Sequence, residues 1–280
     1  MRHFGWIVVA APVAALLLAA CGDEEAPVSA SPSDAPSSDD SGRLYTGIFT
    51  VLENAEHGPQ LCTAVASSLP PQCGGPDVAG WNWDEAPDAE TVDGVTWGFY
   101  SVTGTWDGTT LTLTEPPLAG AATSPMVPDD ALPDFTTPCE PPPGGWAVVD
   151  PATATDAGQA SIGAYTGAQA DWAGTWIDTS VEPAVLNVRF TGDLERHEAE
   201  LRSMWGGPLC VSAAERSMRE LTAIQEELVG SVPHLTSVGP EATANVVLLD
   251  VFVDDGLQEQ LDQQYGPGVV RVSAALRPAE

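Results

Sequence analysis

Residues 185–216, VLNVRFTGDLERHEAELRSMWGGPLCVSAAER, decide the fold that the sequence predicts. Val185–Thr191 is predicted to be a strand, and Leu194–Trp205 to be a helix that follows Asp193, a residue type that favours helix N-caps. A pair of glycines then separates this helix from a second short strand at Leu209–Val211. The stretch therefore predicts a strand–helix–strand unit.

The same pattern recurs about sixty residues later in the chain. Leu186–Phe190 resembles Leu249–Val253 at an offset of 63 residues, and Val211–Arg216 is identical to Val272–Arg277 at five of six positions. Matches that follow one another in the same order favour an internal duplication over chance.

We interpret residues 185–216 and 248–277 as two copies of one unit within an α+β module that spans residues 144–280. Two copies are too few for a solenoid, so we expect a sheet with helices on one face, ferredoxin-like or similar. Further elements expected here are a helix within Ala152–Ala170, strands at Gly174–Asp178, Asn245–Val253 and Val269–Ala274, and a helix over Leu257–Tyr265. A capping-box pattern at Ser212–Glu215 predicts one more helix, from Ala213 to Val229.

Residues 44–115 predict a different construction, a small all-β barrel or sandwich module. If the module is a barrel, we expect it to be of the oligomer-binding type. Thr96–Thr105 and Thr110–Glu115 flank an Asp107-Gly108 pair, a combination typical of a β-hairpin. Strands are also expected at Tyr45–Glu53, Gln60–Val65 and Val78–Trp83. A Pro-rich connector, residues 116–143, joins the two modules.

The composition excludes several classes of protein. The chain of 280 residues has 40 acidic residues against 9 basic ones, with a formal net charge of −31. All nine basic residues are arginines, so no Walker-type phosphate loop or Schiff-base lysine is present. Because nucleic-acid binding depends on neutralising phosphates, so acidic a chain is not expected to bind nucleic acid.

The first residues carry the clearest targeting signal. Arg2 precedes an apolar run from Trp6 to Ala20, and small residues precede Cys21, as in a secretory signal peptide. Leu18-Ala19-Ala20-Cys21 resembles the lipobox of bacterial lipoproteins. The resemblance covers this segment only, and it implies cleavage before Cys21 and acylation of that residue.

The lipobox resemblance sets the expected location. We expect a signal peptide at residues 1–20, then the lipidated Cys21 and a disordered acidic tether up to residue 43. The protein would be held in the lipid bilayer of a cell membrane, on the extracytoplasmic face, by its acyl chains.

Four cysteines remain when Cys21 is assigned to lipid. In an exported protein an even number of cysteines predicts disulfides. Three connectivities are possible, and we favour Cys62–Cys73 together with Cys139–Cys210.

The sequence offers one candidate ligand face and no catalytic motif. Trp81, Trp83, Trp97 and Trp106 lie close together among acidic residues, a composition that suits stacking on sugar rings but is also typical of a barrel core. No metal-ligating motif is found. Acidic clusters such as Asp250, Asp254 and Asp255 leave calcium as the one cofactor to consider.

From these observations we expect a non-catalytic binding or adaptor lipoprotein of the cell envelope, whose partner is an envelope protein or a glycan. Two alternatives stay open. The first is a secreted glycan hydrolase that uses a pair of acidic residues, because forty carboxylates make such a pair possible without selecting it. The second is a folding aid or inhibitor of another exported protein.

Overall fold

The computed structural model describes residues 42–120 and 133–279. The predicted signal peptide, Cys21 and the tether up to residue 41 lie outside the described residues. So do residues 121–132 of the Pro-rich connector. Within the two described ranges, no helix combines the length and the apolar character needed to span a membrane.

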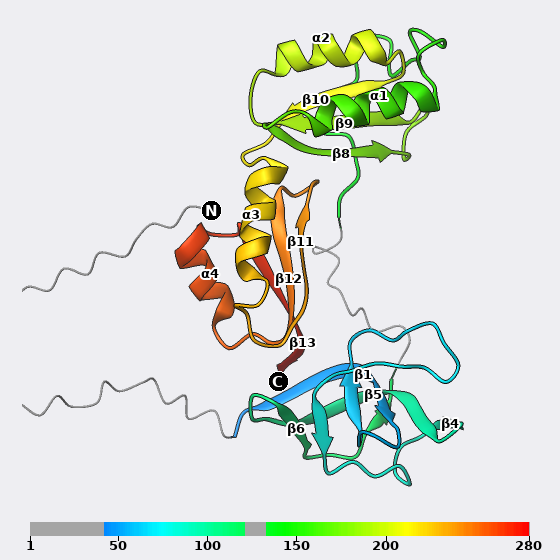
Figure 1. The fold of residues 1–280 in the computed structure, drawn as a ribbon, viewed down its shortest axis with the longest axis vertical. Coiled ribbons are helices and arrows are strands. Elements are labelled where there is room, and N and C mark those ends of the chain that lie inside the picture. Colours follow the sequence, from blue (N-terminus) through cyan, green and yellow to red (C-terminus); the bar gives the residue numbers. More distant parts are fainter. Residues whose placement is uncertain (1–41, 121–132, 280) are drawn as a thin grey trace, which may run out of the picture. The chain divides into compact units, whose positions relative to one another are not determined.

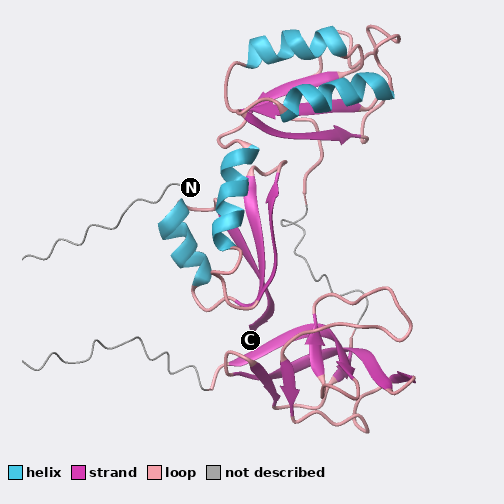
Figure 2. Ribbon diagram, in the orientation of Figure 1, coloured by secondary structure: helices cyan, strands magenta, loops and turns pink. Residues whose placement is uncertain are grey.

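The described residues form a mixed α+β structure in which strands predominate (Figure 1, Figure 2). Its four helices in these ranges are α1 (Asp156–Gly167), α2 (Leu194–Met204), α3 (Met218–Leu228) and α4 (Leu257–Tyr265). The strands are β1 (Leu44–Glu53), β2 (Gln60–Cys62), β3 (Asp77–Ala79), β4 (Glu90–Val92), β5 (Val95–Trp106), β6 (Thr110–Leu113), β7 (Leu118–Ala119), β8 (Trp172–Asp178), β9 (Val185–Phe190), β10 (Leu209–Ala213), β11 (Leu235–Glu241), β12 (Val246–Val253) and β13 (Val270–Pro278).

The early strands close into a ring. β1 pairs with β2 on one side and with β5 on the other, which gives the cyclic order β1–β2–β3–β6–β5. Neighbours are antiparallel except β3 and β6, which run parallel. Tyr45, Phe49 and Tyr100 fill the interior and are at most 1% exposed. The ring agrees with the expectation of a small β barrel.

The predicted hairpin is the one that joins β5 to β6. The Asp107 carboxylate accepts hydrogen bonds from the backbone N–H groups of Thr109 and Thr110, at 2.9 and 2.8 Å. Gly108 has a φ of 98°, which only glycine adopts without strain. These hydrogen bonds also lower the pKa of Asp107, because they stabilise its ionised form.

The residues from α1 to β10 build a three-stranded sheet with the order β10–β9–β8. β8 and β9 are antiparallel, whereas β9 and β10 are parallel. The two helices α1 and α2 pack on one face of this sheet, where Ile162, Val188 and Leu201 are buried together. None of the described helices lies on the opposite face.

The residues from α3 to β13 repeat that arrangement. β11 and β12 are antiparallel, β12 and β13 are parallel, and α3 and α4 cover one face through Leu221, Leu249 and Leu261. We call the two αββαβ units, residues 156–213 and 218–278, the first copy and the second copy. The repeat is therefore larger than the strand–helix–strand unit predicted from the sequence, since each copy also begins with a helix and an antiparallel strand.

The strand register shows which residues are equivalent. Val188 pairs with Val211 in the first copy, and Leu249 pairs with Val272 in the second. Each of these two strands of the first copy therefore precedes its equivalent in the second copy by 61 residues. The offset of 63 predicted for the first of these strands is wrong by two residues. A shift of two residues in the alignment still assigns every side chain to the correct face of the sheet, because side chains alternate along a strand with a period of two.

The second copy differs from the first by longer strands. β12 has 8 residues against 6 in β9, and β13 has 9 against 5 in β10. The added ends bring Phe252 and Leu276 into the core of the barrel, and β13 pairs with β1 at Thr46↔Arg277. The barrel and the second copy thus share one continuous sheet, and Phe252 and Leu276 belong to the barrel core while the helices of the second copy cover a core of their own.

One helix start agrees with the sequence prediction and another differs. Asp193 is at the N-cap of α2 as expected, but it has a φ of 50° and its side chain makes no capping hydrogen bond. The predicted capping box at Ser212–Glu215 is wrong, because β10 continues through Ser212 to Ala213. The capping box forms five residues later, between Ser217 and Glu220, and α3 begins at Met218.

The cysteines pair as we favoured. Cys62 is joined to Cys73 and Cys139 to Cys210, with Cα atoms 5.9 and 5.8 Å apart. The second pair attaches the end of the Pro-rich connector to β10, the third strand of the first copy.

Candidate functional site

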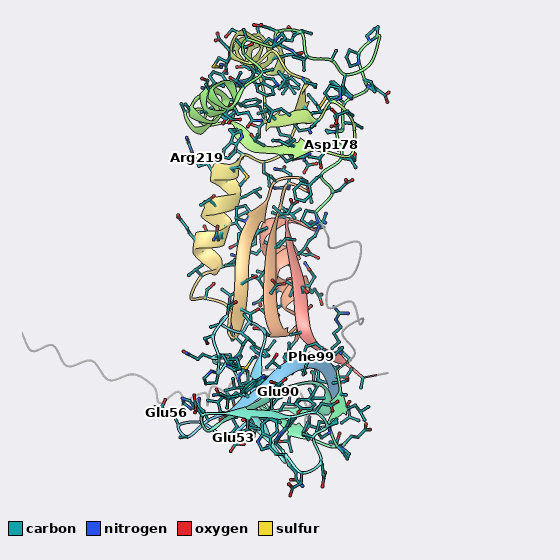
Figure 3. All side chains as sticks on the ribbon, turned by 90° about the vertical axis from the view of Figure 1, so that its right-hand side faces the viewer. Glu53, Glu56, Glu90, Phe99, Asp178 and Arg219 are labelled. Carbon is teal, nitrogen blue, oxygen red and sulfur yellow. A yellow bond between two sulfur atoms is a disulfide. The ribbon has the colours of Figure 1, made fainter. Side chains whose placement is uncertain are left out.

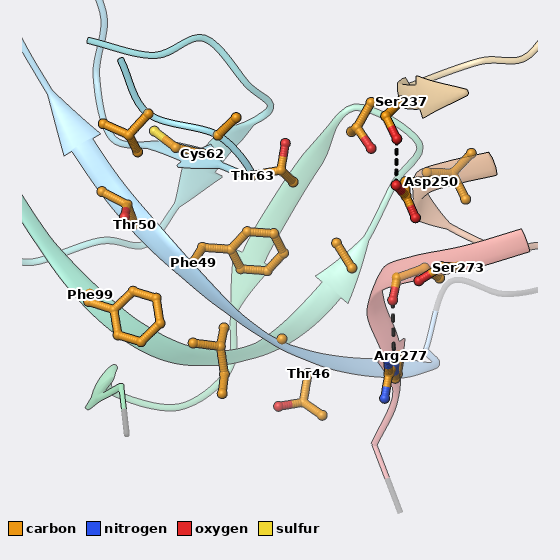
Figure 4. A pocket seen from close by; sticks show the side chains of 18 of the residues that line it. Thr46, Phe49, Thr50, Cys62, Thr63, Phe99, Ser237, Asp250, Ser273 and Arg277 are labelled. Carbon is orange, nitrogen blue, oxygen red and sulfur yellow. Dashed lines mark hydrogen bonds between the residues drawn. The ribbon is translucent and has the colours of Figure 1, made fainter. Parts of the chain in front are cut away.

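A pocket of about 520 Å³ lies where β1 and β5 of the barrel meet the helix-free face of the second copy (Figure 4). Its volume falls within the range of about 300–1,000 Å³ typical of small-ligand sites. The pocket exists because the lengthened strands of the second copy reach the barrel, as shown by the pairing of β1 with β13. Its lining residues are Thr46, Gly47, Ile48, Phe49, Thr50, Cys62, Thr63, Ala64, Val65, Phe99, Ser101, Thr236, Ser237, Asp250, Val251, Ser273, Ala274, Ala275 and Arg277.

One end of the pocket is apolar. Figure 4 shows Phe99 of β5 at this end; Phe49 of the neighbouring β1 also borders the pocket but is only 1% exposed, because its side chain lies in the barrel core. Phe99 and Val65, which also lines the pocket, are each 38% exposed. Large apolar side chains left exposed around a hollow are typical of a binding surface.

The other end is polar and carries both signs of charge. Ser237 donates its hydroxyl proton to Asp250, and the Arg277 Nε donates to the carbonyl oxygen of Ala274 at 3.4 Å (Figure 4). Asp250 and Arg277 are the only charged residues in the lining. A ligand therefore meets one carboxylate and one guanidinium next to an apolar wall.

Several hydroxyl groups of the pocket have no partner among the described residues. They belong to Thr50, Thr63, Ser101 and Ser273. Each hydroxyl can donate one hydrogen bond and accept others, so a ligand with polar backbone or hydroxyl groups would find partners here. The pocket thus offers an apolar wall and a set of free hydrogen-bonding groups.

The four tryptophans do not form one face. Trp81, Trp83 and Trp106 pack against the core of the barrel, and the first two lie edge-on to Tyr100 with ring centroids 5.1 and 6.3 Å away. Trp97 lies on β5 at an odd position, on the face opposite to Tyr100. Burial also raises the pKa of Tyr100, in agreement with a closed apolar interior.

The acidic clusters considered for calcium are engaged separately. Asp254 accepts a hydrogen bond from the backbone N–H of Gln258 at 3.1 Å, and Asp255 accepts one from the hydroxyl of Tyr45 at 3.0 Å. In the described part of the chain, no three His, Cys, Asp or Glu side chains are grouped so that they could hold a metal ion.

A buried histidine forms a second polar cluster, in the first copy. His197 on α2 is 0% exposed. Its Nδ1 lies 2.8 Å from the Tyr165 hydroxyl and its Nε2 lies 2.9 Å from Asp171. The imidazole stacks on Phe190 with centroids 3.7 Å apart. Because the ring is closed off from solvent, this cluster serves the packing of the first copy.

Comparison with known proteins adds no family to this geometry. No protein-family model matches the chain, and no curated protein matches it.

The pocket was not predicted from the sequence. It combines side chains from β1, β5, β11, β12 and β13, and nothing in the local pattern of any one of these strands indicates that they meet. The one feature of the sequence that could have pointed to this pocket is the charge of Arg277 at the end of the second copy.

Proposed function

We propose that the protein is a membrane-anchored extracytoplasmic lipoprotein that binds an envelope component without chemically changing it, and that the pocket between the barrel and the second copy is its binding site. The observation that carries the proposal is the pocket itself, with exposed Phe99 and Val65 beside unpaired hydroxyl groups. The lipobox at Leu18–Cys21 supports the anchored location.

The lining of the pocket favours binding over glycan hydrolysis. Glycoside hydrolases use two carboxylates that flank the scissile bond. Asp250 is the single carboxylate in this pocket, and its oxygen already accepts the hydrogen bond from Ser237. The pocket lining also holds no histidine that could act as a general base.

The arrangement of modules supports the same proposal. A barrel over residues 44–115, a connector and an α+β module with an internal repeat leave the pocket at the junction of barrel and repeat. A site at such a junction can be shaped by both parts, which is where ligand sites commonly occur.

Photo-crosslinking in the host membrane tests the proposal. A photoreactive phenylalanine analogue, p-benzoylphenylalanine, would replace Phe99 at the pocket, or Ile177 on β8 as the matched control. The control position is also on a strand and is 43% exposed. We expect a discrete adduct from position 99 and none from position 177. An absence of adduct at position 99 would contradict the proposed site.

A further inference from the structure

The two copies allow a position-by-position comparison of their helix-free faces. The pairs Val211↔Val188 and Ser212↔Arg189 in the first copy correspond to Val272↔Leu249 and Ser273↔Asp250 in the second. Both copies also have the same register shift near the start of their antiparallel pair, at Trp172/Gly174 and at Leu235/Ser237. Equivalent residues therefore occupy equivalent places on the two sheets.

In the first copy, the helix-free face is covered by a segment of the chain itself. The Pro-rich connector passes over β8, β9 and β10 at residues 135–139. Trp176 on β8 donates its indole proton to the carbonyl oxygen of Phe135 at 3.1 Å. The Asn187 side chain donates to the Thr137 hydroxyl at 3.2 Å.

Two more interactions fix this segment. The backbone N–H of Thr137 donates to the Asp178 carboxylate at 2.8 Å, and the Cys139–Cys210 disulfide ties the segment to β10. The segment runs without regular secondary structure of its own and is held mainly through its backbone and short polar side chains. The first copy thus shows how this kind of sheet face holds a length of polypeptide.

In the second copy, the equivalent face has no such cover among the described residues. Gly239, Leu248 and Arg271 correspond to Trp176, Asn187 and Cys210, three of the four residues that hold the connector in the first copy. The fourth, Asp178, corresponds to Glu241, whose carboxylate accepts hydrogen bonds from its own turn. Apart from the pairing within the sheet, no hydrogen bond of the described residues joins another segment to Gly239, Leu248 or Arg271. Arg271 is exposed, and the pocket opens on the same face at Ser273.

The charge of the face indicates what would bind there. Arg271 and Arg277 lie on the same face of β13 and form no ion pair with a described residue, whereas Asp250 is the one acid of the pocket. Glu241 on β11 lies on the same face, but Glu241 and Asp250 already accept hydrogen bonds from neighbouring residues, which leaves Arg271 and Arg277 as the charges open to a ligand. The segment that covers the first copy is itself flanked by acids, Asp134 and Glu140.

We infer that the helix-free face of the second copy binds an extended, acidic segment of a partner polypeptide, placed as residues 135–139 are placed on the first copy. An apolar side chain of the segment enters the pocket against Phe99 and Val65, and its acidic side chains pair with Arg271 and Arg277. The free hydroxyls of Ser101 and Ser273 are available to its backbone. This inference rests on the proposed function and names the class of ligand.

A peptide selection tests the inference with the full-length protein in detergent micelles. A phage-displayed library of random dodecapeptides is selected on the wild type, and each enriched peptide is synthesised with a fluorescent label. Its affinity is then measured by anisotropy for Arg271→Glu and for Arg219→Glu. Arg219 is the matched control because it is also an exposed arginine but lies on α3 (Figure 3).

We expect the enriched peptides to contain an acidic residue close to an apolar one. Their affinity should fall about tenfold or more for Arg271→Glu and stay unchanged for Arg219→Glu, since a lost ion pair is replaced by a repulsion. If no peptide is enriched, or if Arg271→Glu binds as the wild type does, the inference is wrong. If the selection fails but position 99 still gives an adduct that proteases do not degrade, the ligand is not a polypeptide. The inference would then be wrong, while the proposed function would remain supported.

Discussion

The ring of Phe252 on β12 stacks on the ring of Phe49 on β1, with centroids 5.9 Å apart and ring planes inclined by 11°. Trp106 on β5 also stacks on Phe252, with the two ring centroids 6.3 Å apart. A residue of the second copy is therefore part of the barrel core, and this junction forms the wall behind the pocket.

Phe252→Ala should destabilise the protein by about 3–5 kcal/mol, because it leaves a cavity between two aromatic rings in a fully packed core. Chemical denaturation followed by tryptophan fluorescence measures the change. Phe135→Ala is the matched control, since Phe135 is 54% exposed and its removal should cost less than about 0.5 kcal/mol. Equal losses in the two variants would contradict the place of Phe252 in the barrel core.

Gly47→Ala should weaken the junction of β1 and β13. A Cβ at this position would lie 2.7 Å from the carbonyl oxygen of Ala275, which belongs to the backbone and cannot turn away. We expect a loss of about 1–3 kcal/mol in the free energy of unfolding. Gly239→Ala is the control, because its added Cβ meets nothing within 4 Å, and it should leave stability unchanged or slightly higher.

Acid should loosen the connector from the first copy. Hydrogen bonds from Ser180 and from Thr137 lower the pKa of Asp178 from 3.8 to about 2. A carboxyl group with a lowered pKa adds stability above its unfolded-state pKa and loses it as the pH falls through its folded-state value. The contribution should therefore be complete above about pH 4 and disappear toward pH 2. Denaturation midpoints over this range measure it, and Asp178→Asn should lack this part of the pH dependence.

Tyr165→Phe should cost about 1–3 kcal/mol, because it leaves the Nδ1 of fully buried His197 without its partner. Tyr265→Phe removes a hydroxyl that donates to Glu227 at an exposed site, and it should change stability by less than about 1 kcal/mol. Thermal denaturation of both variants compares them. A similar small effect in both would mean that the histidine finds another partner.

Cys21→Ser tests the proposed anchor. Without the thiol no diacylglycerol can be attached, so the N-terminal peptide of the variant should lack the acyl mass that the wild-type peptide carries. Mass spectrometry of the N-terminal peptide measures the outcome. A wild-type N-terminal peptide without acyl mass would contradict acylation as the anchor.

Local patterns predicted the elements whose sequence carries their own signal. The Asp107-Gly108 hairpin and the helix over Leu257–Tyr265 were found at their observed places. β11 was missed, because Leu235–Glu241 contains Gly239 and Pro240 and does not alternate, and its conformation is set by pairing with β12. The sequence could not distinguish two capping-box patterns five residues apart, and it was the pairing of β10 with β9 that decided between them.

The candidate site was harder to predict for a different reason. Trp97 and Trp106 are close in sequence, but they stand on opposite faces of β5, because one position is odd and the other even. Which face is the core depends on how β5 pairs with β1. The pocket depends on the pairing of β1 with β13, whose residues are more than two hundred positions apart in sequence.

The join between the barrel and the second copy also sets an order of folding. Tyr45 on β1 donates its hydroxyl proton to Asp255 across 210 positions of the chain. Contacts at such separation form slowly, whereas the hairpin and the αββαβ copies can form from local contacts. A chain that emerges from a translocation channel with its N-terminal end first would therefore hold Phe49 uncovered until β12 arrives. If the protein is exported as proposed, closure of the barrel core would follow the translocation of β12.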